Sequence, residues 1–395
     1  MRWQLGRVKS LLAMVERQAR LSFQNAVEIC PLMQTTEPSS SPDLVVCACG
    51  EQEYTAHDAI DTAMFRGELD DKWKKFLRDA AAENRADELD LDLDESAISA
   101  AAEAFRYQHD LITAEETEAW LANRGLTFDD FSDYFARQYC ASAVREDISP
   151  EKVGYDSASP ELRKLFVADL ILSGELDHMT TQLMWRLAAR CAEKEIAPEA
   201  VAAEERNFLD RQGIKRAQLG DWLERLGRDA KWFNEMLALE SAYRKRCETL
   251  LVPRAREREL ATLRLPLTRF ETEVIELESR DAAQEALFCV REDGMSMEEV
   301  AAEGRYPYRR ADFLLEDIPA EGQQRFLSVS AGDVLEPLPR GDGFELCRII
   351  SKVEPQPDDP AVKSRIDQRL LYRHFSELAS RYLERRLGGV STLAK

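Results

Sequence analysis

The sequence predicts an α+β protein in which helices predominate. Helical hydrophobic spacing with capping residues dominates residues 55–265, alternating strand patterns are confined to short regions, and a helix–glycine–helix pattern occurs twice. With 395 residues, 44% of them hydrophobic, the chain can bury more than one core. We therefore expect two or three domains.

The N-terminal region carries no targeting signal that we can identify. Residues 1–30 are expected to form one amphipathic helix, followed by a polar linker at 31–42. The apolar run at 11–15 is interrupted at once by Glu16 and Arg17, which is too short for a secretory signal, and no segment approaches 18 apolar residues. We expect a cytoplasmic protein that does not contact membranes.

The next region combines one strand with several helices. Residues 44–50 predict a short strand ending in a turn, and Thr55 predicts the N-cap of a helix. A further helix is expected at 70–88. The run 89–95 alternates like a strand, but it equally suits the approach to a helix capped by Asp94.

The duplicated pattern has its two copies 88 residues apart. Trp120 and Gly125 in the first copy correspond to Phe208 and Gly213 in the second, and each glycine is followed by a second apolar, aromatic-containing run. A glycine at this position is typical of a left-handed helix end. Neither copy contains a catalytic group, so paired helical hairpins favour a protein that holds something over one that cleaves it.

After Pro266 the pattern changes to that of a small mixed domain. We expect strands at 269–277, 306–313 and 344–353, helices at 281–291, 296–303 and 319–329, a further strand within 330–338 before a hairpin turn at 341–343, and a closing helix at 361–387. The expected domains are 1–43 (helix and linker), 44–265 (helical, with both hairpins), 266–355 (mixed) and 356–395 (closing helix, packed on the helical domain).

The charge distribution excludes one class of function and leaves another open. A net charge of −21 argues against general nucleic-acid binding. Residues 51–100 are acidic, whereas 244–269 and the closing helix are rich in arginine. The basic stretches are either solvated helix faces or a groove for an acidic peptide segment.

No metal or cofactor site is evident. The histidines do not cluster, no glycine-rich phosphate loop is present, and Cys47 and Cys49 form the only close cysteine pair, without further ligands nearby. We expect the cysteines to be small buried side chains and not a disulfide framework. The four histidines are His57, His109, His178 and His374.

Two motifs resemble a known family. The segment Leu44–Thr55 resembles the strand–turn–helix opening of the SurA/PrsA chaperones, and the helices after it resemble their chaperone part. The order from 269 to 353 resembles a parvulin-type (PpiC) prolyl isomerase, most clearly at Ala331–Leu338 followed by Gly343–Ile350. Length and helical content also resemble the PpiC-related proteins of bacterial peptide maturation systems.

The departures from the parvulin pattern concern its catalytic residues. Parvulins place one histidine on the first strand and one on the last; here Glu273, or a close neighbour, and Glu345 occupy these positions. The catalytic loop is shortened, and Gly322 or a polar neighbour replaces the aromatic residue of the proline pocket. The two glutamates either face each other, so that one keeps its proton, or pair with Arg309, Arg310 or Arg348.

The resemblance implies a protein that binds peptides without catalysis. The expected ligand is an extended peptide or the precursor of a ribosomally made, modified peptide, and no catalytic residue is assigned. An active isomerase with a rearranged site is the first alternative, and a scaffold that docks a peptide-modifying enzyme is the second. The expected peptide-binding residues are Phe313, Ile318, Leu327, Phe344 and Glu345.

Overall fold

A computed structural model describes residues 44–144, 160–193, 195–341 and 343–387. The expected helix at 1–30 and the linker after it lie outside these residues. The chain is α+β and mainly helical, as expected, with one three-stranded and one four-stranded sheet. It divides into two compact units: one ends at Arg246 and resumes at Phe375, and the other comprises Cys247–His374.

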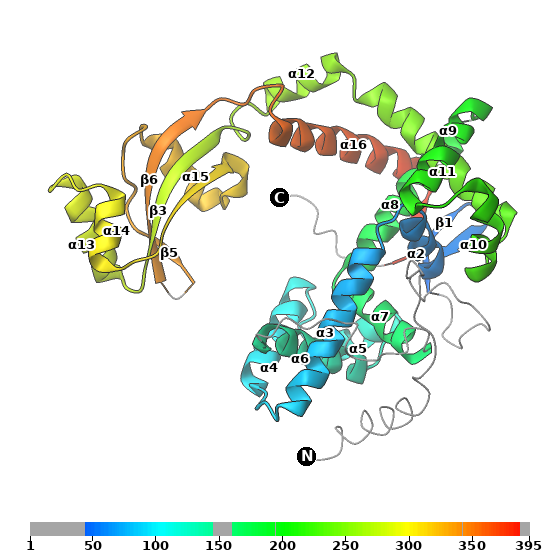
Figure 1. The fold of residues 1–395 in the computed structure, drawn as a ribbon, viewed down its shortest axis with the longest axis horizontal. Coiled ribbons are helices and arrows are strands. Elements are labelled where there is room, and N and C mark those ends of the chain that lie inside the picture. Colours follow the sequence, from blue (N-terminus) through cyan, green and yellow to red (C-terminus); the bar gives the residue numbers. More distant parts are fainter. Residues whose placement is uncertain (1–43, 145–159, 194, 342, 388–395) are drawn as a thin grey trace. The chain divides into compact units, whose positions relative to one another are not determined.

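The first unit begins with a strand hairpin and continues through helices (Figure 1). The expected strand and Thr55 cap are confirmed, and Asp94 caps a helix, which settles the ambiguous 89–95 run. The elements are β1 (Val45–Cys49), β2 (Gln52–Thr55), α2 (Ala56–Phe65), α3 (Asp70–Glu88), α4 (Glu95–Gln108), α5 (Ala114–Ala122), α6 (Phe128–Ala143), α7 (Pro160–Leu172), α8 (Glu175–Ala192), α9 (Pro198–Gln212), the 3-10 helix η3 (Arg216–Gln218), α10 (Leu219–Arg225) and α11 (Ala230–Leu250).

Both copies of the duplicated pattern end a helix in the same way. Gly125 and Gly213 have φ angles of 67° and 63°, in the left-handed region. The residue after each glycine donates its backbone N–H to the carbonyl five residues earlier, from Leu126 to Leu121 and from Ile214 to Leu209. The copies differ afterwards, because α6 follows the first directly whereas η3 precedes the short α10 in the second.

Aromatic side chains build the core of the first unit. Phe208 is fully buried; its ring stacks on Phe65 at 4.6 Å and meets Trp222 edge-on at 5.1 Å. Phe375, from the closing helix, stacks on Trp185 of α8 at 5.6 Å. The C-terminal end of the closing helix therefore packs within the helical unit, as the sequence led us to expect.

The closing helix is shorter than predicted. α16 (Pro360–Tyr382) ends before the expected position at 387, and β7 (Glu384–Arg385) then pairs with β1, giving the order β2-β1-β7. The backbone N–H groups of Arg386 and Leu387 donate to the Val46 carbonyl. Residues 384–387 therefore bind the free edge of β1 instead of continuing the helix that the sequence predicted there.

The second unit contains the four-stranded sheet. Its elements are α12 (Pro253–Thr262), β3 (Arg269–Leu277), α13 (Arg280–Arg291), α14 (Met297–Gly304), β4 (Tyr308–Leu314), the 3-10 helix η4 (Leu315–Asp317), α15 (Ala320–Ser328), β5 (Leu338–Arg340), β6 (Gly343–Val353) and the first part of α16. The strands are antiparallel in the order β4-β3-β6-β5. The predicted order of strands and helices is confirmed; α12 was not predicted.

Each face of this sheet has its own core, visible in Figure 1 as α13 and α14 on one side of β3 and β6 and α15 on the other. Ile275, Leu277 and Leu346 pack against α13 and α14. Phe270, Val274 and Ile349 pack against α15 through Phe326. From Thr272 to Leu277 of β3 and from Phe344 to Ile349 of β6, alternation therefore turns successive side chains toward opposite faces of the sheet.

Candidate functional site

The two glutamates at the parvulin histidine positions lie on opposite faces of the sheet. Glu273 is opposite Arg348, and Glu345 is opposite Glu276. Directly opposed residues of an antiparallel pair share a face, and positions 273 and 276 of β3 point to opposite faces. The possibility that Glu273 and Glu345 face each other is therefore wrong.

The alternative, that each glutamate pairs with arginine, is confirmed. Glu273 Oε1 lies 3.5 Å from Arg310 Nη2 and accepts a hydrogen bond from the Tyr308 hydroxyl, and Glu273 Oε2 lies 3.7 Å from Arg348 Nη1. Glu345 accepts from Arg309 Nη2 at 2.9 Å and also from Arg340. The glutamate side chains are 13% and 15% exposed, so each carboxylate is largely buried, whereas the arginine side chains that cover it are 37% to 71% exposed.

The remaining predicted peptide-binding residues are only partly brought together. Phe313, Ile318 and Leu327 join the core cluster under α15, on the Glu345 face of the sheet. Phe344 packs in the opposite core, against α13 and α14. All four side chains are partly buried, and their role in binding stays a prediction.

Cys347 is the nucleophilic group nearest to this region, and its environment makes it unreactive. It lies two residues after Glu345 on β6, opposite Val274, with 3% of its surface exposed. Burial raises the pKa of the Cys347 thiol to about 12. A thiol with such a pKa is almost entirely protonated near neutral pH and is a weak nucleophile.

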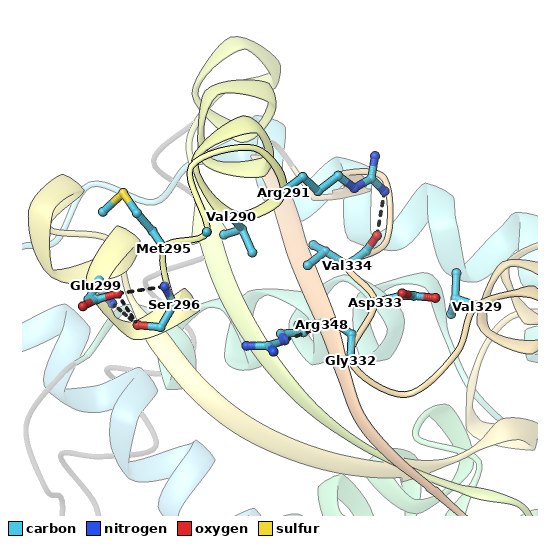
Figure 2. A pocket seen from close by; sticks show the side chains of 11 residues that line it. Val290, Arg291, Met295, Ser296, Glu299, Val329, Gly332, Asp333, Val334 and Arg348 are labelled. Carbon is cyan, nitrogen blue, oxygen red and sulfur yellow. Dashed lines mark hydrogen bonds between the residues drawn. The ribbon is translucent and has the colours of Figure 1, made fainter.

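The sequence did not indicate the groove that the second unit contains, between α13–α14 and the segment that precedes β5 (Figure 2). A pocket of about 700 Å³ has one wall at the end of α13 and the start of α14, the other at residues 329–334, and Arg348 at its base. A second pocket of about 490 Å³ adjoins it and shares Arg291, Val329 and Val334. No single residue pattern marks this groove, because its walls are separated by about 40 residues of sequence.

Backbone hydrogen bonds hold the wall formed by residues 329–334 in place. Leu335 donates its N–H to the Cys347 carbonyl at 2.8 Å, and Ile349 donates to the Asp333 carbonyl at 2.9 Å. The Arg291 side chain crosses the groove and donates from Nη2 to the Val334 carbonyl at 2.6 Å, and Figure 2 shows this bond. Arg291 therefore separates the two pockets.

The second pocket carries excess positive charge. Arg280, Arg291 and Arg325 line it together with one carboxylate, Glu336, which pairs with Arg291. Among the described residues, no carboxylate pairs with Arg280 or Arg325, and both side chains are exposed. This local positive charge is available to a ligand although the chain as a whole is acidic.

The basic stretches noted in the sequence are, by contrast, engaged within their own units. Arg256 binds Asp367 through two nitrogens, at 2.6 and 2.8 Å, and Arg373 similarly binds Glu259. Arg269 pairs with Asp359, and Arg365 with Asp317. These arginines stabilise the fold and do not form the basic groove that the sequence left open.

The described residues show no metal site and no helix that could cross a membrane. No group of three or more histidine, cysteine, aspartate or glutamate side chains is placed to hold a metal ion within the ranges given above. No helix in those ranges is both long and apolar enough to span a bilayer.

Comparisons with known proteins give remote structural similarities. No family model matches the chain, and no curated protein sequence does. The chain is similar to the peptidylprolyl isomerase PrsA from Bacillus cereus (TM-score 0.35, 12% identity, covering 56% of this chain and 86% of that one) and from Bacillus anthracis (0.30, 14%, 52% and 95%). It is also similar to one of two SurA-like chaperones from Campylobacter jejuni (0.18, 9%, 54% and 88%). None of these similarities establishes an activity for this chain.

Proposed function

We propose that this chain is a non-catalytic, chaperone-like protein that holds extended peptides in the groove of its second unit. The observation that carries the proposal is the pair of adjoining pockets on either side of Arg291. An extended segment lying along this groove can fill both pockets with its side chains. Such contacts can be made by peptides of many different sequences, which is what a protein that holds peptides requires.

The charge of the groove favours peptides with acidic segments. Arg280 and Arg325 offer two guanidinium groups that no described carboxylate neutralises. Arginine binds carboxylates through paired hydrogen bonds, and these bonds strengthen when water is excluded. An acidic residue of the peptide at this pocket would contact both side chains.

The sheet supplies support for the non-catalytic part of the proposal. Prolyl isomerisation needs stabilisation of a twisted amide against a barrier of roughly 18–20 kcal/mol. Here Glu273 and Glu345 lie on opposite faces with their carboxylates bound by arginine, and the Cys347 thiol is buried. The two glutamates therefore do not converge on one amide bond.

The narrower parts of the proposal come from the sequence alone. The ligand would be the precursor of a ribosomally made, modified peptide, handled in the cytoplasm. Phe313, Ile318, Leu327, Phe344 and Glu345 stay predicted peptide-binding residues, although none of them lines either pocket of the groove. Docking of a peptide-modifying enzyme is the second possibility. Salt-sensitive co-purification with such an enzyme would support it.

The test is a titration of fluorescently labelled 15-residue peptides with the full-length chain. One peptide is acidic, one is neutral, and one carries lysine in place of each acid; a precursor peptide encoded beside this chain's gene is added where one exists. We expect the acidic peptide to bind at least 10-fold more tightly than the basic one. The double variant Arg280→Glu/Arg325→Glu is expected to abolish that preference.

The matched control is Arg78→Glu/Arg206→Glu, which changes the net charge equally on exposed helix positions of the first unit. It should keep the preference. If the groove variant leaves binding unchanged, the groove is not the binding site, whereas no binding of any peptide at high micromolar concentration would contradict the proposed function.

A protease-coupled Xaa-Pro assay tests the isomerase alternative, since the uncatalysed cis–trans exchange is slow. Acceleration that is lost in Glu345→Ala would favour that alternative.

A further inference from the structure

Two cysteines that are far apart in sequence meet in the first unit. Cys49 is the last residue of β1, and Cys191 lies in the last turn of α8. Their Sγ atoms are 3.4 Å apart, although 142 residues separate them in the chain. In the sequence the only cysteine close to Cys49 is Cys47, so the proximity of Cys49 to Cys191 was not predicted.

The accessibility of the two thiols differs from that of the other cysteines around them. Cys191 is exposed and Cys49 is half-buried, whereas Cys47 on the same strand is fully buried. The expectation that the cysteines are small buried side chains therefore holds for Cys47 and fails for Cys191. A reagent in solvent reaches Cys191 first and Cys49 through it.

A metal ion is not the favoured partner of this pair. Tetrahedral zinc sites in proteins use three or four protein ligands, and the described residues around Cys49 and Cys191 supply no third histidine, cysteine or carboxylate in position. The polar neighbour is Tyr54 of β2, whose pKa is raised to about 12 by burial and by the nearby thiols, so it stays protonated near neutral pH.

We propose that Cys49 and Cys191 are a modification site at which the chain forms an internal disulfide. A disulfide has an S–S length of about 2.05 Å, so the sulfur atoms must approach by roughly 1.4 Å, which side-chain rotation can supply.

The co-reactant is a small-molecule disulfide such as oxidised glutathione. Burial and the neighbouring Cys49 thiol raise the pKa of the Cys191 thiol to about 11, so the thiolate fraction and the rate of attack rise with pH. The Cys191 thiolate attacks one of the sulfur atoms of oxidised glutathione; the S–S bond of glutathione breaks, and one glutathione thiolate leaves. The Cys49 thiolate then attacks the Cys191 sulfur of the mixed disulfide and releases the second glutathione. Overall, two protein thiols lose two electrons and two protons, and one oxidised glutathione becomes two reduced molecules.

The bond would join the three-stranded sheet to the helical core. β1 is the middle strand of the order β2-β1-β7, so the cross-link fixes both the hairpin and the C-terminal strand to α8. It closes a loop that contains α2 to α7, and long closed loops lose the most entropy in the unfolded chain. Such a bond persists in oxidising compartments and is reduced in the cytoplasm, so its state in cells also tests the expected location.

The experiment treats the full-length protein with excess oxidised glutathione and maps disulfides by mass spectrometry of unreduced digests. The expected result is one Cys49–Cys191 cross-linked peptide and a melting temperature of the first unit about 5–10 °C above that of the reduced protein. Cys191→Ser should lose both effects, and Cys289→Ser, which changes a cysteine of the second unit, should keep them.

Three results would overturn the proposal. One is a stable glutathione adduct on Cys191 without a cross-link, and another is a cross-link to a different cysteine. The third is an unchanged melting temperature in protein that is fully cross-linked. Because Cys191 is exposed, Cys191→Ser is expected to fold, and circular dichroism of the reduced variant checks this independently.

Discussion

Glu273 on β3 and Arg348 on β6 lie directly opposite each other, with a carboxylate oxygen 3.7 Å from Arg348 Nη1. Three register positions further along β3, Glu345 lies opposite Glu276, and therefore on the other face of the sheet. This arrangement separates the two positions at which the sequence resembles an isomerase. Whether the two positions can act together therefore depends on the strand register as well as on which residues occupy them.

Restoring both histidines should not restore isomerase activity. In Glu273→His/Glu345→His the two imidazoles would project from opposite faces, so they cannot act on one amide. We expect the protease-coupled rate for an Xaa-Pro peptide to equal the uncatalysed rate, for the double variant and for Glu345→His alone. Acceleration by the double variant only would show that the register described here is wrong.

The buried pair Arg186–Glu240 should be a major contributor to the stability of the first unit. Arg186 of α8 donates from Nε to Glu240 of α11, their side chains are 6% and 10% exposed, and Arg66 Nη1 lies 3.9 Å from the same carboxylate oxygen. Glu240→Gln leaves the buried Arg186 guanidinium without its paired carboxylate, whereas Arg66 keeps Glu68, so we expect a loss of about 3 kcal/mol in the free energy of unfolding by urea.

The control for that measurement is an exposed pair of the same chemistry. Glu377 and Arg381 pair one helical turn apart on α16 and are more than half exposed. Glu377→Gln should change the free energy of unfolding by at most about 0.5 kcal/mol. Equal effects of the two substitutions would contradict the burial of the Arg186–Glu240 pair.

The glycine that ends α9 should be sensitive to substitution because of its backbone and not because of packing. Gly213 has a φ of 63°, and a Cβ added there would meet no atom within 4 Å. Gly213→Ala should therefore cost about 1 kcal/mol, the cost of a side chain in the left-handed region. Gly220, inside α10, has equally open surroundings and no positive φ, so Gly220→Ala should stabilise by about 0.5–1 kcal/mol. Urea denaturation of both variants checks the difference in sign.

The helices and strands that the sequence predicted correctly are those that local sequence patterns encode. The bounds of α3 and β3 follow from periodicity and flanking residues, and the start of α9 follows from Pro198. β2 and β7 were missed because such short strands are defined by pairing with β1, which their own residues do not encode.

The candidate site was less predictable than the fold for a related reason. Glu273 and Glu345 were identified as residues, but the face on which each lies depends on strand register, and a slip of one residue reverses it. The groove and the Cys49–Cys191 contact join segments that are distant in sequence, so no local sequence pattern predicts them.

The stability of the first unit should fall between pH 5 and pH 7.5, in part because of Glu83 on α3. Burial raises the pKa of its carboxyl to about 7, against the opposing effect of Arg137, whose Nη1 lies 3.8 Å away; Asp133 and Asp87 add to the rise. A folded-state pKa above the unfolded value means that the folded protein binds more protons in this window. The stabilisation is therefore present below about pH 4.5 and is lost as pH rises through about 7.

Glu83→Gln should remove this component of the pH dependence. About a third of the Glu83 side chain is open to water, which screens its electrostatic interactions. Between pH 5 and pH 7.5 we therefore expect the free energy of unfolding to fall by about 1 kcal/mol less in the variant than in the unsubstituted chain. Glu88→Gln, at an exposed position of the same helix, is the control and should leave the slope unchanged. Parallel curves for the Glu83→Gln variant and the unsubstituted chain would mean that Glu83 is ionised at the lower pH, and that Arg137 outweighs burial.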